Sequence, residues 1–171
     1  MSTLKVNSIS ALTSDDRLTI DANQVVNRNM FTNGAFEVAQ RLSYESNGKS
    51  ISSENYTGID MFKTRVNSCT VLLTQSTTAP VGFTSSLKVD VTSADTSLAS
   101  GVYNTIVGHI EGYDIARTAI GTSDAKTCTL SFYVRSNLTG TFTGSIGNSA
   151  NNRSYAFDYT ISSANTWERK T

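Results

Sequence analysis

Few residues in this chain have the types and spacing that catalysis requires. The single histidine, His109, is followed two positions later by Glu111. Both lie in an alternating, strand-like segment, which places their side chains on the same face. A His–Glu pair can act in general acid–base catalysis. A hydrogen bond on a half-exposed strand is nevertheless the favoured interpretation, because no Gly-x-Ser-x-Gly elbow supplies a nucleophile.

Acidic residues and glycines suggest two further kinds of site. Asp60, Glu111, Asp114 and Asp158 would suit glycoside hydrolysis only if two carboxyl groups lay at a defined separation with different pKa values. Solvated strand and loop acids are the favoured interpretation. The run 140–147 (GTFTGSIG) resembles a phosphate loop but has no lysine and no predicted helix after it. Its glycines are expected at bends of a sheet. We therefore predict that the chain is not an enzyme and holds no cofactor.

The cysteines and the charges exclude several other classes. Cys69 and Cys128 are too few for a zinc site or a disulfide framework. Both fall on predicted inward faces and could pair if their strands are neighbours, but buried free thiols are favoured. The 14 basic and 14 acidic residues balance and are spread thinly. No basic cluster suits a nucleic acid, and no apolar run approaches the length of a membrane span. We predict neither nucleic-acid binding nor membrane insertion, and no metal site.

The composition favours strands over helices. The chain has 24 serines, 24 threonines and 14 asparagines, but one proline and only 16% charged residues. Small hydroxyl and amide side chains suit tight turns and solvent-facing strand positions, and they weaken helix interiors because they compete for backbone hydrogen bonds. We therefore expect an all-β protein.

Alternation of apolar and polar residues locates the expected strands. The clearest alternating segments are 69–74, 87–92, 126–135 and 155–161, and weaker ones are 61–66, 102–111 and 140–146. In the longest, Cys128, Leu130, Phe132 and Val134 are expected to face inward. Turn-forming clusters lie at 46–48, 78–82, 121–124 and 148–152, and one helical turn is expected at 113–119. Short strands with frequent turns are typical of an antiparallel β-sandwich.

The first thirty residues differ from the rest. They hold small apolar groups separated by polar turns, and none is large enough to bury a core alone. We predict that residues 1–30 form an arm that adds strands or apolar pegs to neighbouring chains, while a frayed terminus is the alternative. The residues expected to anchor the arm are Leu4, Val6, Ile9, Leu18, Ile20, Val25, Val26 and Met30.

At the other end of the chain, the run 165–171 begins a new strand, so the sandwich of 31–171 is expected to continue in a longer polypeptide.

Several stretches resemble a known group of proteins. The run 31–41 (FTNGAFEVAQR) is similar to the opening strand of jelly-roll modules in phage tail fibres and related virion appendages, and to that of carbohydrate-binding modules. The runs 86–89 (SLKV), 110–112, 125–136 and 151–168 resemble further strands of these modules. The start of the chain, 2–7 (STLKVN), is similar to that of marine-phage fibre proteins.

The resemblance implies a jelly-roll-like sandwich in a structural protein of a phage virion. It implies that the arm docks on other virion proteins, such as a tail adaptor, nozzle or head vertex. It also implies that the fibre is a homotrimer, with host recognition in more distal regions. The alternative is a carbohydrate-binding module that contacts host surface glycans. In that case Tyr44, Tyr133 and Trp167 are the candidate sugar-stacking residues. The resemblance does not carry a calcium-binding role over to Glu37, because the family's closing strand has no counterpart here.

Overall fold

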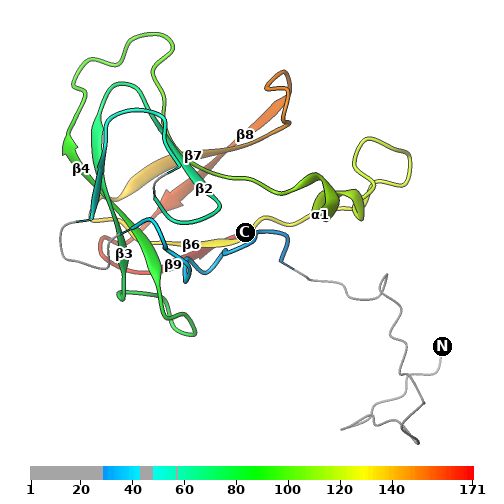
Figure 1. Cartoon of the computed structure of the whole chain (residues 1–171), viewed down its shortest axis with the longest axis horizontal. Helices are drawn as coiled ribbons and strands as arrows, with labels where there is room; N and C mark the ends of the chain where they lie inside the picture. The colour runs from blue at the N-terminus through cyan, green and yellow to red at the C-terminus, as the bar shows by residue number, and fades with distance from the viewer. Residues whose placement is uncertain (1–28, 43–47, 57) are drawn as a thin grey trace, which may run out of the picture. The chain divides into compact units, whose positions relative to one another are not determined.

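The computed structural model describes residues 29–42, 48–56 and 58–171. The chain divides into two units, Met1–Met30 and Phe31–Thr171, and nearly all described residues belong to the second. Within the described residues there are nine strands and one short helix (Figure 1). Their bounds are β1 Lys49–Ile51, β2 Phe62–Val66, β3 Thr70–Ser76, β4 Ser86–Ser93, β5 Asn104–Gly108, α1 Gly112–Ala116, β6 Phe132–Val134, β7 Gly140–Gly147, β8 Ser154–Ile161 and β9 Glu168–Lys170.

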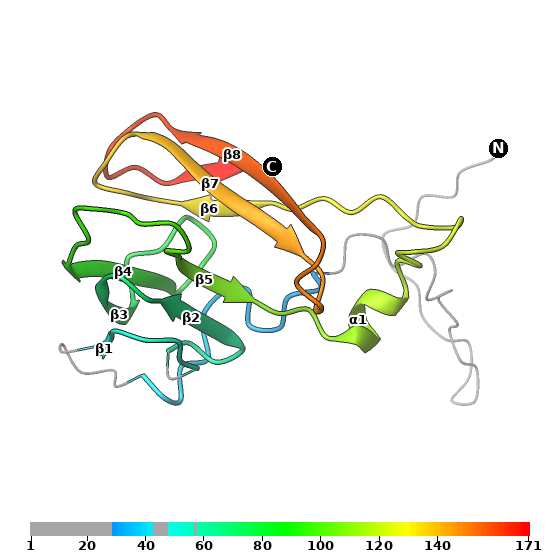
Figure 2. The ribbon, with the colours of Figure 1, turned by 90° about the horizontal axis from the view of Figure 1, so that it is seen from above.

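All strand pairs in the described part of the chain are antiparallel. One sheet has the order β1-β3-β4, and the other strands form the pairs β2-β5, β6-β9 and β7-β8. In Figure 2 the pairs β6-β9 and β7-β8 lie on the opposite side of the unit from β1. The prediction of an antiparallel all-β fold is therefore confirmed. These pairings do not by themselves establish the full strand order of a jelly roll.

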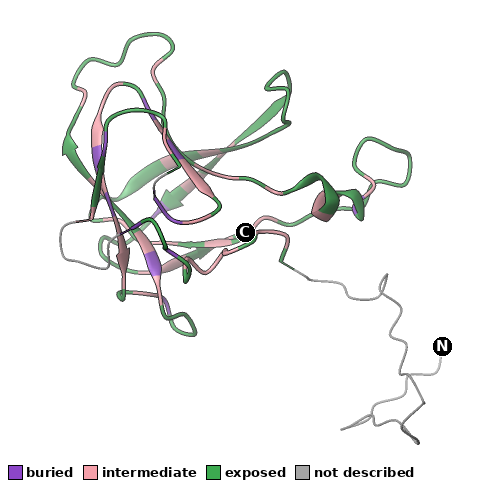
Figure 3. Cartoon of the chain, in the orientation of Figure 1, coloured by how far each residue is buried: buried purple, intermediate pink, exposed green. Residues whose placement is uncertain are grey.

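The main hydrophobic core lies around β2 and β3, where most buried residues gather (Figure 3). Val71 and Leu73 of β3 point inward, as their alternation predicts, and Val66 of β2 joins them. The buried members are Ala39, Leu42, Ile51, Ile59, Val66, Val71 and Leu73, with Phe36, Phe62, Cys69 and Leu87 packed against them. The opening segment thus supplies part of the core, although it forms no strand of its own.

A second, smaller apolar group joins the strands of the C-terminal half. The ring of Tyr159 on β8 packs edge-on against Phe132 of β6, with ring centroids 5.1 Å apart. It also stacks on Phe142 of β7 at 5.9 Å. Burial raises the pKa of the Tyr159 hydroxyl. Ile161 at the end of β8 is fully buried. The inward set on β8 therefore follows the predicted alternation, except that Tyr155 at its start is exposed.

One glycine of the GTFTGSIG run has a definite packing role. Gly144 of β7 lies opposite Phe157 of β8, and a Cβ added at Gly144 would collide with the Phe157 ring. The run forms the whole of β7 and is followed by the β7-β8 turn, so it has no phosphate-loop geometry. A cross-strand aromatic ring lying over a strand glycine stabilises the pair through packing that the glycine itself cannot supply.

The strand predicted at 126–135 is mostly absent. Only Phe132–Val134 forms a strand, and it pairs with β9. Residues 125–131 have no regular secondary structure, because no described strand lies beside them to complete a ladder. Phe132 and Val134 are half-buried, as predicted, but Cys128 is exposed, so the prediction of an inward Cys128 is wrong. Alternation marks a segment that can pair, and pairing itself requires a partner.

A carboxylate holds the loop between β8 and β9. Oε1 of Glu168 accepts hydrogen bonds from the backbone N–H groups of Ser162 and Ser163, both at 2.8 Å. Its Oε2 lies 2.6 Å from Nζ of Lys170. The hydrogen bond from Lys170, followed by those from the two serine amides, lowers the pKa of Glu168 below its usual value, against an opposing effect of desolvation. The ionised carboxylate therefore supports the approach of β9 to the end of β8.

Candidate functional site

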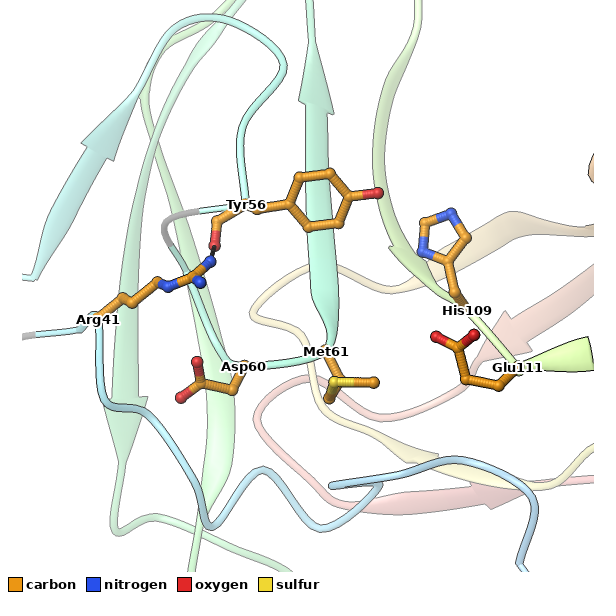
Figure 4. Close-up of a pocket in the computed structure, with 6 residues that line it drawn as sticks. All are labelled: Arg41, Tyr56, Asp60, Met61, His109 and Glu111. Atoms are coloured by element: carbon orange, nitrogen blue, oxygen red, sulfur yellow. Dashed lines mark hydrogen bonds between the residues drawn. The ribbon is translucent and has the colours of Figure 1, made fainter. Parts of the chain in front are cut away.

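An open groove of about 260 Å³ brings together most of the chemically distinctive side chains (Figure 4). Three parts of the chain contribute to it: the opening segment, the loop between β1 and β2, and the segment after β5. The lining residues are Arg41, Tyr56, Asp60, Met61, His109 and Glu111. We call this site the Tyr56 groove.

Asn33 ties the opening segment to the floor of the Tyr56 groove. Its Nδ2 donates to the carbonyl oxygens of Val38, at 2.8 Å, and Asp60, at 2.9 Å. Its Oδ1 accepts from the backbone N–H of Val38 at 2.9 Å. Asn33 has a φ of 59°, in the left-handed region that asparagine tolerates better than most residues. The asparagine of the opening motif is therefore a positioning residue that holds two remote segments together.

Asp60 and Met61 form the centre of a tight turn. The backbone N–H of Phe62 donates to the carbonyl of Ile59 at 3.1 Å, and Met61 has a φ of 70°. A side-chain-bearing residue in this conformation costs about 1–2 kcal/mol. Oδ2 of Asp60 accepts from the backbone N–H of Gln40 at 2.6 Å. The turn is thus fixed against the opening segment, and the Asp60 carboxylate faces the groove with one oxygen already engaged.

Tyr56 provides the aromatic wall. Its side chain is 47% exposed, and its ring centroid lies 6.2 Å from that of His109. Nη1 of Arg41 donates to the Tyr56 carbonyl at 3.2 Å, as the dashed line in Figure 4 shows. Nζ of Lys63 lies 5.0 Å from the ring centroid, a cation–π contact that orients the ring.

Glu54 in turn holds Lys63. The carboxylate of Glu54 forms ion pairs with Lys63 and with Arg65. The hydrogen bond from Lys63, the largest influence, and that from Arg65 lower the pKa of Glu54, although desolvation acts in the opposite direction. The pairs are partly exposed to solvent, so their contribution to stability is small. Their role near the groove is to limit the directions in which Lys63 can lie.

His109 and Glu111 occupy the far wall of the Tyr56 groove. Both side chains are exposed and line the same groove, which agrees with the prediction that they share a face. Among the described residues, no hydrogen bond joins His109 to Glu111. In Figure 4 the Glu111 carboxylate points toward the groove. The predicted hydrogen bond between them is therefore not formed.

The groove combines one guanidinium, two carboxylates, one imidazole and an exposed aromatic ring. Such a surface can stack a flat apolar face and hydrogen-bond to hydroxyl groups around it. The groove is open and carries opposite charges side by side. These features suit reversible binding of a hydroxyl-rich ligand better than the exclusion of water that most catalysis requires.

The residues predicted to stack on sugars lie elsewhere or outside the described residues. Tyr133 on β6 is 42% exposed and packs edge-on against Phe83, with centroids 5.6 Å apart. Trp167 is half-buried, and its Nε1 is enclosed without a hydrogen-bond partner in the described part of the chain. Tyr44 lies outside the described residues, as do the predicted anchoring residues of the arm except Met30, which is half-buried.

The remaining candidate groups are dispersed. Asp114 lies in the first turn of α1, and Asp158 on β8 accepts a hydrogen bond from Thr143. Glu37 is exposed and accepts from the Thr84 hydroxyl at 3.1 Å. Within the described ranges, no group of three or more His, Cys, Asp or Glu side chains is arranged to hold a metal ion. No helix in that part of the chain is long and apolar enough to cross a membrane.

The two cysteines are free and differ in environment. Cys69 is half-buried, and its Sγ–H donates to Oδ1 of Asn104 at 3.1 Å. Burial, and secondarily the negative charge of Asp95, raises the pKa of the Cys69 thiol. Cys128 is exposed. Of the two alternatives left open by the sequence, the structure has both thiols free, and the expectation that both are buried is wrong for Cys128.

The sequence pattern paired His109 with Glu111 and named Asp60 among the candidate carboxylates, but it did not connect them with Arg41, and it missed Tyr56 and Met61. These residues come from segments about fifty positions apart, and no local pattern connects them. Two sequence signals lay near the groove: the His109–Glu111 spacing, and the opening motif 31–41, which contains both Asn33 and Arg41.

Comparison of the chain with protein-family models, with curated proteins and with solved structures gave no match. The candidate site therefore rests on its own geometry.

Proposed function

We propose that this chain is a structural, non-catalytic component of a phage virion appendage of the tail-fibre kind. The unit 31–171 acts as a jelly-roll-like β module in this proposal. Support comes from the antiparallel all-β architecture and from the resemblance of the opening motif and of the Ser86–Val89 run, which lies in β4.

The observation that carries the proposal is the exposure of large apolar side chains on strand faces. Val91 on β4, Ile146 on β7 and Tyr155 on β8 are each more than half exposed. Ile146 and Tyr155 lie directly opposite one another in the β7-β8 pair, so their exposed side chains adjoin, and a subunit of a larger assembly covers such apolar surface with a neighbouring chain. Exposed apolar surface of this kind favours a role in assembly over a role in catalysis.

The arm and the three-fold symmetry are further parts of the proposal. Residues 1–30 dock on another virion protein, and three copies assemble around a shared axis. Deletion of codons 1–30 from the gene tests the docking role. We expect particles that lack this protein by mass spectrometry and immunogold labelling, while the truncated chain is still produced. Particles that carry the truncated chain at the normal level would refute docking through the arm.

The Tyr56 groove supports a second candidate function, the binding of host surface glycans. The specific observation is the convergence of the half-exposed Tyr56 ring with Arg41, Asp60, His109 and Glu111. In protein–sugar contacts an aromatic ring covers the apolar face of the sugar, and charged or amide groups bind its hydroxyls. Binding through such an open groove is expected to be weak for one copy and to gain strength through several copies.

A glycan array with the whole chain tests the second candidate. Tyr56→Ala is expected to abolish the binding signal, whereas Tyr113→Ala, at an exposed tyrosine on α1 that does not line the groove, should leave it unchanged. Tyr133→Ala, at the position predicted from sequence, provides a second comparison. Loss of binding in Tyr133→Ala but not in Tyr56→Ala would show that the glycan binds at β6 and not in the Tyr56 groove. Absence of binding to any glycan by the wild-type chain would reject this candidate.

A further inference from the structure

A second groove opens between the β2-β5 pair and the β1-β3-β4 sheet. It has a volume of about 140 Å³ and is lined mainly by apolar groups. Its residues are Thr64, Val66, Cys69, Val71, Val89, Val91, Asn104, Thr105 and Ile106. The two β4 valines are the most exposed of the apolar residues there, with Val89 41% and Val91 60% exposed. The side chains of Val89 and Val91 therefore form an apolar surface along β4 that the described residues leave partly exposed.

β4 is also a free edge. It pairs with β3 on one side, and within the described residues no strand pairs with its other side. β4 spans eight residues, which is long for an unprotected edge. The unpaired N–H and C=O groups of such an edge form a template for another strand.

The sequence of β4 is chemically palindromic about Val89. Residues at equal distances on either side of Val89 have matching or complementary side chains. The pairs are Lys88 with Asp90, Leu87 with Val91, Ser86 with Thr92, and Ser85 with Ser93. If two identical strands pair antiparallel with Val89 opposite Val89, each of these residues meets its complement on the other chain.

We propose that β4 pairs antiparallel with β4 of a second copy of this chain, about a two-fold axis at Val89. The product is a continuous six-stranded sheet in the order β1-β3-β4-β4-β3-β1. Pairing satisfies the free edge of both copies. It also brings Leu87, Val89 and Val91 of each copy together on the groove side of the sheet.

The charges on the other face select this register. Nζ of Lys88 lies 2.7 Å from Oδ2 of Asp90 in the same strand, and both side chains are largely exposed. In the proposed register each Lys88 also faces Asp90 of the second copy, so four charges alternate in sign. A shift of two residues in one direction places Lys88 opposite Lys88, and a shift in the other places Asp90 opposite Asp90. Like charges directly opposite one another destabilise an antiparallel pair.

This inference does not depend on the virion proposal. A two-fold contact through β4 is also separate from a three-fold axis formed by the arm. A chain that used both would build assemblies larger than a trimer.

Cross-linking at the axis is the most direct test. In the full-length chain, Val89→Cys is introduced together with Cys69→Ser and Cys128→Ser. Directly opposite residues of an antiparallel pair have Cα atoms about 4.5 or 5.5 Å apart, within the range that a disulfide spans. Mild oxidation should therefore give a band of twice the chain mass on a non-reducing gel. Val81→Cys in the same background is the control, since Val81 is fully exposed in the loop before β4. Equal cross-linking of both variants, or of neither, would overturn the proposal.

A charge exchange tests the register independently. Lys88→Asp and Asp90→Lys each convert both interchain pairs into like-charge pairs, and each is expected to weaken association by roughly tenfold or more. The double variant restores opposite charges at both positions and should recover association. Sedimentation velocity over a concentration series measures the effect, with far-ultraviolet circular dichroism to check folding. A wild-type chain that stays monomeric overturns the proposal. So do single variants that assemble like the wild type, or a folded double variant that fails to recover.

Discussion

Truncation of Leu73 to alanine removes the side chain at the centre of the main core. Leu73 is 1% exposed and lies on β3, the strand that pairs with both β1 and β4. A Cβ added at Gly58 would stand only 2.8 Å from Cδ1 of Leu73, so the backbone of the β1-β2 loop packs directly against the leucine. Neighbouring strands and this loop are held by backbone hydrogen bonds, which limits how far they can collapse into the vacated space.

The expected loss of stability for Leu73→Ala is about 2–5 kcal/mol, the sum of the lost hydrophobic transfer and the remaining cavity. For a denaturant dependence of about 1–3 kcal/mol per molar urea, the midpoint should fall by roughly 0.7–5 M. Equilibrium urea unfolding, followed by far-ultraviolet circular dichroism, measures the change. Many domains have a total stability of only about 5–15 kcal/mol, so the variant should retain its fold by a narrow margin.

Leu98→Ala is the matched control for this prediction. Leu98 is 72% exposed, so the same chemical change should alter stability by less than about 0.5 kcal/mol. If Leu73→Ala also changed stability by less than this amount, the cluster around β3 would not be the core. It would then not be the packing that stabilises β1, β2 and the opening segment.

Three further outcomes follow from the packing and the titratable groups. Gly144→Ala should destabilise the β7-β8 pair by about 1–3 kcal/mol in urea unfolding, since its methyl group enters the space of the facing aromatic ring; a neutral or stabilising change would contradict that packing. Because hydrogen bonding to Lys170 lowers the folded-state pKa of Glu168, stability from Glu168 is present above its usual pKa of 4.5 and is lost as the pH falls through the lower folded value. Glu168→Gln should therefore flatten the acid limb of a stability–pH profile, and an unchanged limb would argue against the bond. A thiol reagent should modify the exposed Cys128 quickly and Cys69 slowly, because burial raises the pKa of Cys69; equal rates would disprove the difference in environment.

The sequence by itself determined the class of secondary structure and much of its placement. Alternation located β2, β3, β4, β5, β7 and β8, because the two-residue period of a strand is written locally in the order of apolar and polar residues. A single helical turn was expected separately at 113–119, and the structure has α1 at Gly112–Ala116. On β3 the inward set Val71 and Leu73 was predicted correctly, because β3 has a paired strand along each edge and one of its faces packs on the core.

Tertiary structure decided which of these local patterns were used. Residues 126–131 alternate as well as any strand but remain irregular, because a strand is a property of two paired segments and no described segment lies beside this one. Val89 and Val91 alternate as core residues do, yet they stay partly exposed because the groove between them and the β2-β5 pair is open. Whether an apolar face is buried depends on the partner that covers it.

Apart from the shared face of His109 and Glu111, the Tyr56 groove was decided by tertiary structure. Arg41, Tyr56 and His109 meet because Asn33 fastens the opening segment to the Asp60 turn and because β5 lies beside β2. Each contact joins segments far apart in the chain, where the number of possible pairings is too large for a local pattern to choose among them. The sequence determines which side chains are present, and the long-range hydrogen bonds bring them together in one groove.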